Sequence, residues 1–134
     1  MELSEFNALK EKVAKFVEVN DKNVSDRILS WAKNYSQILD KFVTETRILA
    51  DLKTDLDEIH GLILRDLKEK GNYVLKTQEQ EYYIFSDPKY KEHKIKVNRQ
   101  EMIVSYLENL LGMIKNLQYN LKSYVDLKMF LGGK

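Results

Sequence analysis

The sequence contains no cysteine, and only 5 glycines and 1 proline among its 134 residues. The absence of cysteine excludes disulfides, thiolate metal sites, iron–sulfur clusters and cysteine nucleophiles. Because β-sandwiches and barrels need turn residues at short, regular intervals, so few glycines and prolines argue against an all-β fold. No apolar run approaches the roughly 18 residues that span a bilayer, and the first residues lack the layout of a signal peptide. We therefore expect one mainly all-α domain over residues 1–134, in a reducing cytoplasm and without membrane contact.

Charge is nearly balanced over the whole chain but differs between its halves. The sequence holds 22 basic and 21 acidic side chains, for a net charge of +1. Residues 1–69 carry a balance of −3, whereas residues 70–134 carry a balance of +4. Any attraction to a polyanion is therefore expected to centre on the C-terminal half.

The strongest pattern is a heptad seam in the first half of the chain. Apolar residues alternate spacings of three and four, with one slot near Glu45 and Thr46 left polar. The seam consists of Ile28, Trp31, Tyr35, Ile38, Phe42, Leu49, Leu52, Leu56, Ile59, Ile63 and Leu67. It predicts one helix over residues 25–71, roughly 69 Å long. Such a helix has to bury its seam against other helices of the chain or against other copies of it.

Two further helices are predicted at the ends of the chain. Apolar spacing indicates a first helix over residues 2–19, and the Asn-rich residues 20–23 form a turn that completes segment 1–24. A C-terminal helix is expected over 98–134, because Asn98 and Glu101 form a capping-box pattern. Its apolar residues, from Ile103 to Tyr124, again step by three and four. Two heptad helices in one small chain favour self-association.

The insert between them, residues 72–97, has a different composition. Five aromatic residues fall within 18 positions: Tyr73, Tyr82, Tyr83, Phe85 and Tyr90. Residues 74–77 and 82–85 are expected to pair as a short β-hairpin, or else to form an irregular loop, although no hairpin turn sequence joins them. Asp87 followed by Pro88 indicates the start of a short helix.

No constellation for catalysis is evident. His60 and His93 do not fall in a metal-binding spacing, and no glycine-rich loop exists to cradle a phosphate. Asp55, Asp57 and Glu58 would support a small hydrolase or nuclease only if they held a metal, and a lack of magnesium-dependent cleavage would exclude that class. We therefore expect no enzyme activity, no cofactor and no metal.

A basic and aromatic patch is the feature that points to a ligand. Residues 87–99 carry a balance of +3, and three aromatic residues directly precede them. Its five cations are Lys89, Lys91, Lys94, Lys96 and Arg99. Cations can follow a phosphate backbone while rings stack on unpaired bases, a combination that favours single-stranded nucleic acid. The alternative is that the rings form a small core and the lysines a solvated surface.

Several segments are similar to the UvsY proteins of T4-type bacteriophages. The similar residues are Trp31, Lys33, Tyr35, Ser36, 47–49, 106–108, Ile114, Lys115, Leu121, Lys122, Tyr124, Val125, Phe130, Gly133 and Lys134. The resemblance covers residues 25–134 and is strongest over the last 30. It implies a recombination mediator, without enzyme activity or cofactor, that acts in the host bacterial cytoplasm during infection.

The resemblance also implies partners and sites. Such mediators bind single-stranded DNA, load a RecA-like recombinase (UvsX type) onto DNA covered by the phage single-stranded-DNA-binding protein, and form rings of about six or seven copies. The implied oligomerisation residues are Ile114, Leu117, Leu121, Tyr124, Val125 and Phe130. A coiled-coil interaction or assembly-chaperone protein with no DNA binding remains the alternative.

The family's basic stretch, which ends in Tyr-Tyr-Ser-Gly, has two possible positions here. Residues 52–61 match part of it but place acid where a cation is expected. Residues 65–71 keep the charge and the glycine but lack the paired tyrosines, and we prefer this position on electrostatic grounds. Beside the five cations of the patch, the expected DNA-binding residues are Arg65, Lys68, Lys70 and Tyr83.

Overall fold

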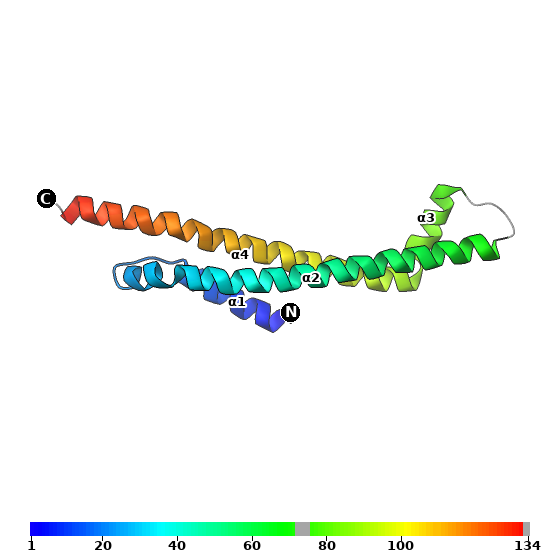
Figure 1. The fold of residues 1–134 in the computed structure, drawn as a ribbon, viewed down its shortest axis with the longest axis horizontal. Coiled ribbons are helices and arrows are strands. Elements are labelled where there is room, and N and C mark those ends of the chain that lie inside the picture. Colours follow the sequence, from blue (N-terminus) through cyan, green and yellow to red (C-terminus); the bar gives the residue numbers. More distant parts are fainter. Residues whose placement is uncertain (72–75, 133–134) are drawn as a thin grey trace. The chain divides into compact units, whose positions relative to one another are not determined.

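The chain folds into four α-helices in the computed structural model, which describes residues 1–71 and 76–132. In chain order they are α1 (Leu3–Phe16), α2 (Val24–Lys70), α3 (Thr77–Ser86) and α4 (Pro88–Gly132) (Figure 1). None of the described residues lies in a strand. The helical fold class is therefore confirmed, and the long helix expected over 25–71 differs from α2 by one residue at each end.

The helices contribute to two compact units. The first unit combines residues 1–44 with residues 105–134, and the second consists of residues 45–104. Both long helices therefore contribute a segment to each unit. The expectation of a single domain over 1–134 stays a prediction.

The first unit packs α1 against the first part of α2 and the last part of α4. Its buried apolar residues recur every three or four positions, as a shared helical face requires. They are Leu9, Val13, Phe16, Ile38, Leu107, Leu110, Leu111, Ile114, Leu117 and Leu121. Phe6 adds an edge-to-face contact with Tyr106, with ring centroids 4.8 Å apart. A 14-residue helix is marginal by itself, so this burial is what stabilises α1.

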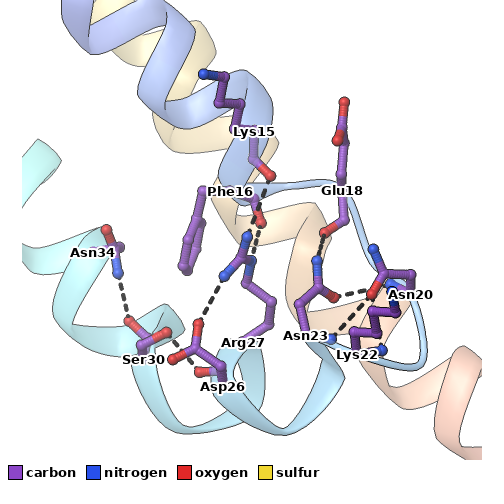
Figure 2. Close-up of polar contacts among 10 residues, drawn as sticks. All are labelled: Lys15, Phe16, Glu18, Asn20, Lys22, Asn23, Asp26, Arg27, Ser30 and Asn34. Carbon is purple, nitrogen blue, oxygen red and sulfur yellow. Dashed lines mark hydrogen bonds and ion pairs between the residues drawn. The ribbon is translucent and has the colours of Figure 1, made fainter.

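A hydrogen-bonded turn joins α1 to α2 (Figure 2). Asn20 Oδ1 accepts bonds from the backbone N–H groups of Lys22 and Asn23, and Asn23 Oδ1 accepts one from the N–H of Asn20. This confirms the turn expected at 20–23. The helix expected over 2–19 ends earlier, at Phe16. In a longer helix the Asn20 N–H would donate to the Phe16 carbonyl. Here the Asn20 N–H donates to Asn23 Oδ1 within the turn, and Arg27 Nε donates to the Phe16 carbonyl at 2.8 Å.

In the second unit, α2 and α4 run antiparallel and α3 packs beside them. Gln100 is hydrogen-bonded to Glu45, and His93 Nε2 lies 3.0 Å from the Leu52 carbonyl, which fixes the antiparallel register. The buried residues of this unit are Leu56, Ile84, Val97, Glu45 and Gln100. Within this unit, α2 is thus paired with α4 of the same chain.

The β-hairpin expectation is wrong. Residues 82–85 lie inside α3, and of the expected first strand, 74–77, residues 74 and 75 lie outside the described residues while Thr77 begins α3. Glutamine and glutamate have good helix propensity, and the Gln-Glu-Gln-Glu run at 78–81 supplies the body of the helix. Ile84 is then buried to 1% exposure, while Tyr82, Tyr83 and Phe85 remain exposed.

The last helix begins ten residues earlier than the capping-box pattern suggests. α4 starts at Pro88, where the Asp87 carboxylate accepts the Lys89 backbone N–H at 2.8 Å. The helix start expected at Asp87 and Pro88 is therefore confirmed, but the helix continues unbroken to Gly132. Asn98 and Glu101 lie in its interior, where Glu101 forms an ion pair with Lys53 at 3.5 Å.

Candidate nucleic-acid interface

A groove lies beside the end of α3 and the start of α4. It encloses about 530 Å³ and is lined by Phe85, Tyr90, Lys91, Lys94 and Ile95. This volume falls within the ~300–1,000 Å³ typical of small-ligand sites. Phe85 and Ile95 are 47% and 67% exposed, so the apolar wall faces solvent. The groove therefore combines two rings, one aliphatic side chain and two cations, and we call it the aromatic–basic groove.

Three helices hold the rings of the aromatic–basic groove in place. The ring centroids of Phe85 (α3) and Tyr90 (α4) are 5.3 Å apart, with planes tilted by 45°. The imidazole of His60 (α2) lies 6.4 Å from each of them. His60 and Tyr90 are half-buried, whereas Phe85 is exposed. The Phe85 ring thus has ring neighbours on α2 and α4 and still presents about half of its surface to solvent.

The cations of the patch are distributed around α4 rather than along one face. All five are exposed. Lys91 and Lys94, one helical turn apart, line the aromatic–basic groove. Lys96 lies about 200° around the helix from Lys94, and it shares its face with Lys89, seven residues earlier. The structure therefore brings two of the five predicted cations to the rings.

Tyr83 and the basic cluster of α2 lie outside the aromatic–basic groove. Tyr83 is 47% exposed on α3 and contacts Tyr82, with ring centroids 5.8 Å apart. Arg65, Lys68 and Lys70 occupy the last two turns of α2, where Lys70 pairs with Asp66 at 3.8 Å. Lys70 is about 15 Å along the helix axis from His60. None of these four residues lines the groove.

The other position for the family's basic stretch, residues 52–61, presents little free positive charge. Lys53 is paired with Glu101, and Leu56 is buried. Asp55 and Asp57 are exposed. Within the part of the chain that the structure describes, no group of three or more histidine, aspartate or glutamate side chains is arranged to hold a metal ion.

Sequence reasoning missed Ile95, which lines the aromatic–basic groove, and His60, whose imidazole neighbours the two rings of the groove. Ile95 lies outside the seam, two residues before the buried Val97, and so on the opposite side of the helix. In the sequence, the signal for Ile95 was an apolar residue that does not share the helical face of the other apolar residues of α4. His60 gave no signal, because its contact with Phe85 depends on how α3 folds back.

The residues predicted for oligomerisation fall into three groups: buried, half-buried and exposed. Ile114, Leu117 and Leu121 are between 0% and 4% exposed in the core of the first unit. Phe130 is 70% exposed near the end of α4. The role of the C-terminal helix in oligomerisation stays a prediction, but its three leucine and isoleucine residues already pack within the chain.

The remaining two, Tyr124 and Val125, are half-buried. The Tyr124 hydroxyl donates a hydrogen bond to the Asp21 carboxylate. Val125 lines a smaller apolar groove of about 270 Å³ together with Trp31 and Ile28. No helix among residues 1–71 and 76–132 has the length and apolar character to cross a membrane.

Crystal structures of the recombination mediator protein UvsY of bacteriophage T4 have the same fold as this chain. One crystal form aligns with a TM-score of 0.81 over 98% of each chain, at 14% sequence identity. Two others align with TM-scores of 0.79 and 0.77, at 15% and 14% identity, over 93% and 92% of this chain and 97% and 98% of the T4 chain. These alignments establish the fold.

Sequence comparison establishes the family. No curated protein sequence matches the chain. The family model described as "Recombination, repair and ssDNA binding protein UvsY" matches residues 31–134, close to the span 25–134 over which the residues themselves resemble that family. The chain therefore belongs to the UvsY family of recombination, repair and single-stranded-DNA-binding proteins.

Proposed function

We propose that this protein is a recombination mediator. It binds single-stranded DNA and promotes the loading of a RecA-like recombinase (UvsX type) onto DNA covered by the phage single-stranded-DNA-binding protein, in the host bacterial cytoplasm. The observation that carries the proposal is the aromatic–basic groove, in which Phe85 and Tyr90 share a 530 Å³ space with Lys91 and Lys94. Membership of a family described by recombination, repair and ssDNA binding supports it.

The two kinds of side chain in the aromatic–basic groove match the two parts of a single strand. Lysine ammonium groups neutralise phosphates and release counterions, and exposed rings stack on bases that no second strand covers. Arg99 and the α2 cluster of Arg65, Lys68 and Lys70 continue the proposed path. Each protomer then offers only a few screened contacts and binds weakly by itself.

Self-association of the chain would compensate for the weak DNA binding of each protomer. We propose a homo-oligomer, in the form of a ring of about six or seven copies, because linked sites make later contacts intramolecular. The last turns of α4 support such an interface, since they expose a run of large apolar side chains and an exposed apolar patch often marks a protein–protein contact. The run consists of Leu127, Met129, Phe130 and Leu131, each 53–70% exposed.

Loading of the recombinase would follow from many weak contacts between the ring and one DNA strand. A ring that wraps the strand competes with the single-stranded-DNA-binding protein for phosphates and bases, and it presents a bent template to the recombinase. The groove residues supply binding and orientation only, so the proposal includes no covalent step and no cofactor.

The experiment is fluorescence anisotropy of a labelled single strand of about 30 nucleotides against the matched duplex, at low and high salt. We expect a preference for the single strand that weakens steeply with salt. Lys91→Gln combined with Lys94→Gln should lower the slope of log affinity against log salt by about 1.4, since each phosphate contact on a single strand contributes about 0.7. Lys89→Gln with Lys96→Gln removes the same charge from the other side of α4 and serves as the matched control.

Two results would overturn the proposal. Absence of single-strand binding at low salt favours a coiled-coil interaction or assembly-chaperone protein instead. Equal losses from the two double variants show attraction by net charge rather than binding in the groove. Where binding is found, the lag before recombinase ATP hydrolysis on protein-covered single strands tests loading, and the groove variant should lengthen that lag.

A further inference from the structure

α3 displays aromatic rings to solvent to an unusual degree. It has 10 residues, and only Ile84 is buried. Tyr82, Tyr83 and Phe85 are 70%, 47% and 47% exposed. Tyr82 and Phe85 are three residues apart and so are neighbours on one side of the helix. Exposed apolar rings gathered on a short helix mark an interaction surface.

Phe85 differs from the two tyrosines because its ring has ring neighbours from two other helices. Tyr90 supports its ring at 5.3 Å, and His60 supports it at 6.4 Å from a second helix. Tyr82 and Tyr83 contact each other in an edge-to-face arrangement. A ring fixed by two neighbours loses little rotational freedom when a planar ligand stacks on it, so less of the stacking energy is spent on ordering the side chain.

The charges around the Phe85 ring indicate what kind of planar ligand fits. Lys91 and Lys94 line the same groove, whereas Glu81, one helical turn before Phe85, lies on the α3 side. An anionic group attached to the ligand would therefore lie toward α4. A nucleotide of a single strand has this layout, with a flat base joined to a phosphate.

We propose that Phe85 is a stacking platform for unpaired bases and that Lys91 and Lys94 bind the phosphates that flank the stacked base. This inference rests on the proposed function and adds a specific mode to it. Part of the affinity of each protomer comes from bases rather than from charge. The protein therefore discriminates a normal single strand from a strand of equal charge that has no bases, and from a duplex whose bases are covered.

The test compares binding to an oligothymidine strand and to an abasic strand of the same length and charge. We expect the intact protein to bind oligothymidine more tightly. Phe85→Leu, which keeps an apolar side chain, should weaken oligothymidine binding about fivefold or more, because stacking contributes about that much per base. It should leave abasic binding unchanged. Tyr119→Leu is the matched control, since Tyr119 is a ring 62% exposed on α4 in the first unit.

A second readout places the base at the ring itself. Phe85→Trp in a Trp31→Phe background carries one indole, because the sequence contains one tryptophan. Its fluorescence should be quenched by oligothymidine and not by the abasic strand. Circular dichroism of each variant verifies that the helices are retained.

The outcomes separate this inference from the proposed function. If both strands bind equally, or if Phe85→Leu and Tyr119→Leu have the same effect, the stacking platform is wrong while single-strand binding stands. If neither strand binds at low salt, the proposed function fails and the inference fails with it. Quenching by both strands would show a conformational response to charge and would also overturn the stacking mode.

Discussion

Gln100 and Glu45, 55 residues apart in the sequence, form a buried polar pair between α4 and α2. The Gln100 side-chain amide donates to the Glu45 backbone carbonyl at 2.9 Å and to its carboxylate at 2.7 Å. The two residues are 7% and 5% exposed. Glu45 occupies the polar slot in the α2 seam, so the interruption of the heptad pattern corresponds to a specific cross-helix contact. A polar pair of this kind fixes the register of two helices whose apolar residues would tolerate sliding.

Gln100→Leu should destabilise the fold by about 1–3 kcal/mol, because it removes two hydrogen bonds from a buried carboxylate and its backbone carbonyl. The free energy of unfolding is measured by urea titration. Glu45→Leu combined with Gln100→Leu should recover most of the loss, since an apolar pair of similar volume needs no hydrogen bonds. A double variant as unstable as Gln100→Leu would contradict this explanation, and altered oligomer size in the double variant would reveal the loss of register.

Arg27, near the start of α2, connects α2 to the end of α1 and makes three kinds of contact. Its guanidinium donates to the carbonyls of Phe16 and Lys15, pairs with Asp26 at 2.7 Å, and lies 4.9 Å from the centre of the Phe16 ring. Figure 2 shows these groups converging on the C-terminal end of α1.

Arg27→Lys should destabilise the protein by about 1–2 kcal/mol, because an ammonium cannot reproduce the planar fork that reaches two carbonyls. Thermal unfolding followed by circular dichroism measures the loss. Lys22→Arg is the control, since Lys22 contributes only its backbone N–H to the turn. A fully stable Arg27→Lys variant would show that charge at this position is sufficient.

Asp21 and Tyr124 join the turn to the far end of α4. The Tyr124 hydroxyl and the Lys128 ammonium lower the pKa of the Asp21 carboxyl, and the hydrogen bond to Asp21 raises the pKa of the Tyr124 hydroxyl. The depressed carboxyl pKa stabilises the fold above about pH 3.9, the unfolded value, and this stabilisation is lost as pH falls through the folded pKa. The raised phenol pKa stabilises the fold below about pH 10 and is lost as pH rises through its folded value.

Tyr124→Phe should therefore lower Tm by a constant small amount near neutral pH, where both groups keep their native charge. The difference from the unchanged protein should shrink only in strong acid and strong alkali. Tm measured across pH tests this, and Tyr119→Phe, at an exposed ring on the same helix, is the control. A difference that varied between about pH 6 and pH 8, where neither group titrates, would contradict the assignment.

The heptad seam was sufficient to predict α2 to within one residue, because a long apolar repeat leaves few alternatives. The region around α3 was harder, since Tyr82, Tyr83 and Phe85 have strand propensity, whereas residues 78–81 favour a helix and the burial of Ile84 depends on tertiary packing. The patch of lysines was visible in the sequence. Its division into Lys91 and Lys94 on one side and Lys89 and Lys96 on the other required the start of α4 at Pro88, which sets the rotation of every later side chain.

Burial also changes which residue of α4 tests self-association. Leu121 belongs to the predicted oligomerisation set, but it is 4% exposed inside the first unit, so Leu121→Asp would unfold that unit along with any interface. Phe130 is 70% exposed, so most of its ring surface faces solvent and its replacement should disturb the core of the first unit far less than Leu121→Asp.

Phe130→Asp should reduce the oligomer to smaller species, as measured by light scattering coupled to size exclusion, with unchanged helix content. Single-strand affinity should fall at least tenfold although no DNA contact is altered, because each protomer loses the effective concentration supplied by its neighbours. Ser123→Asp, at an exposed position of α4, is a control for added negative charge near the end of the helix. A Phe130→Asp monomer that bound DNA as tightly as the parent would show that affinity resides in the single protomer, and an unchanged oligomer would place the interface elsewhere on the chain.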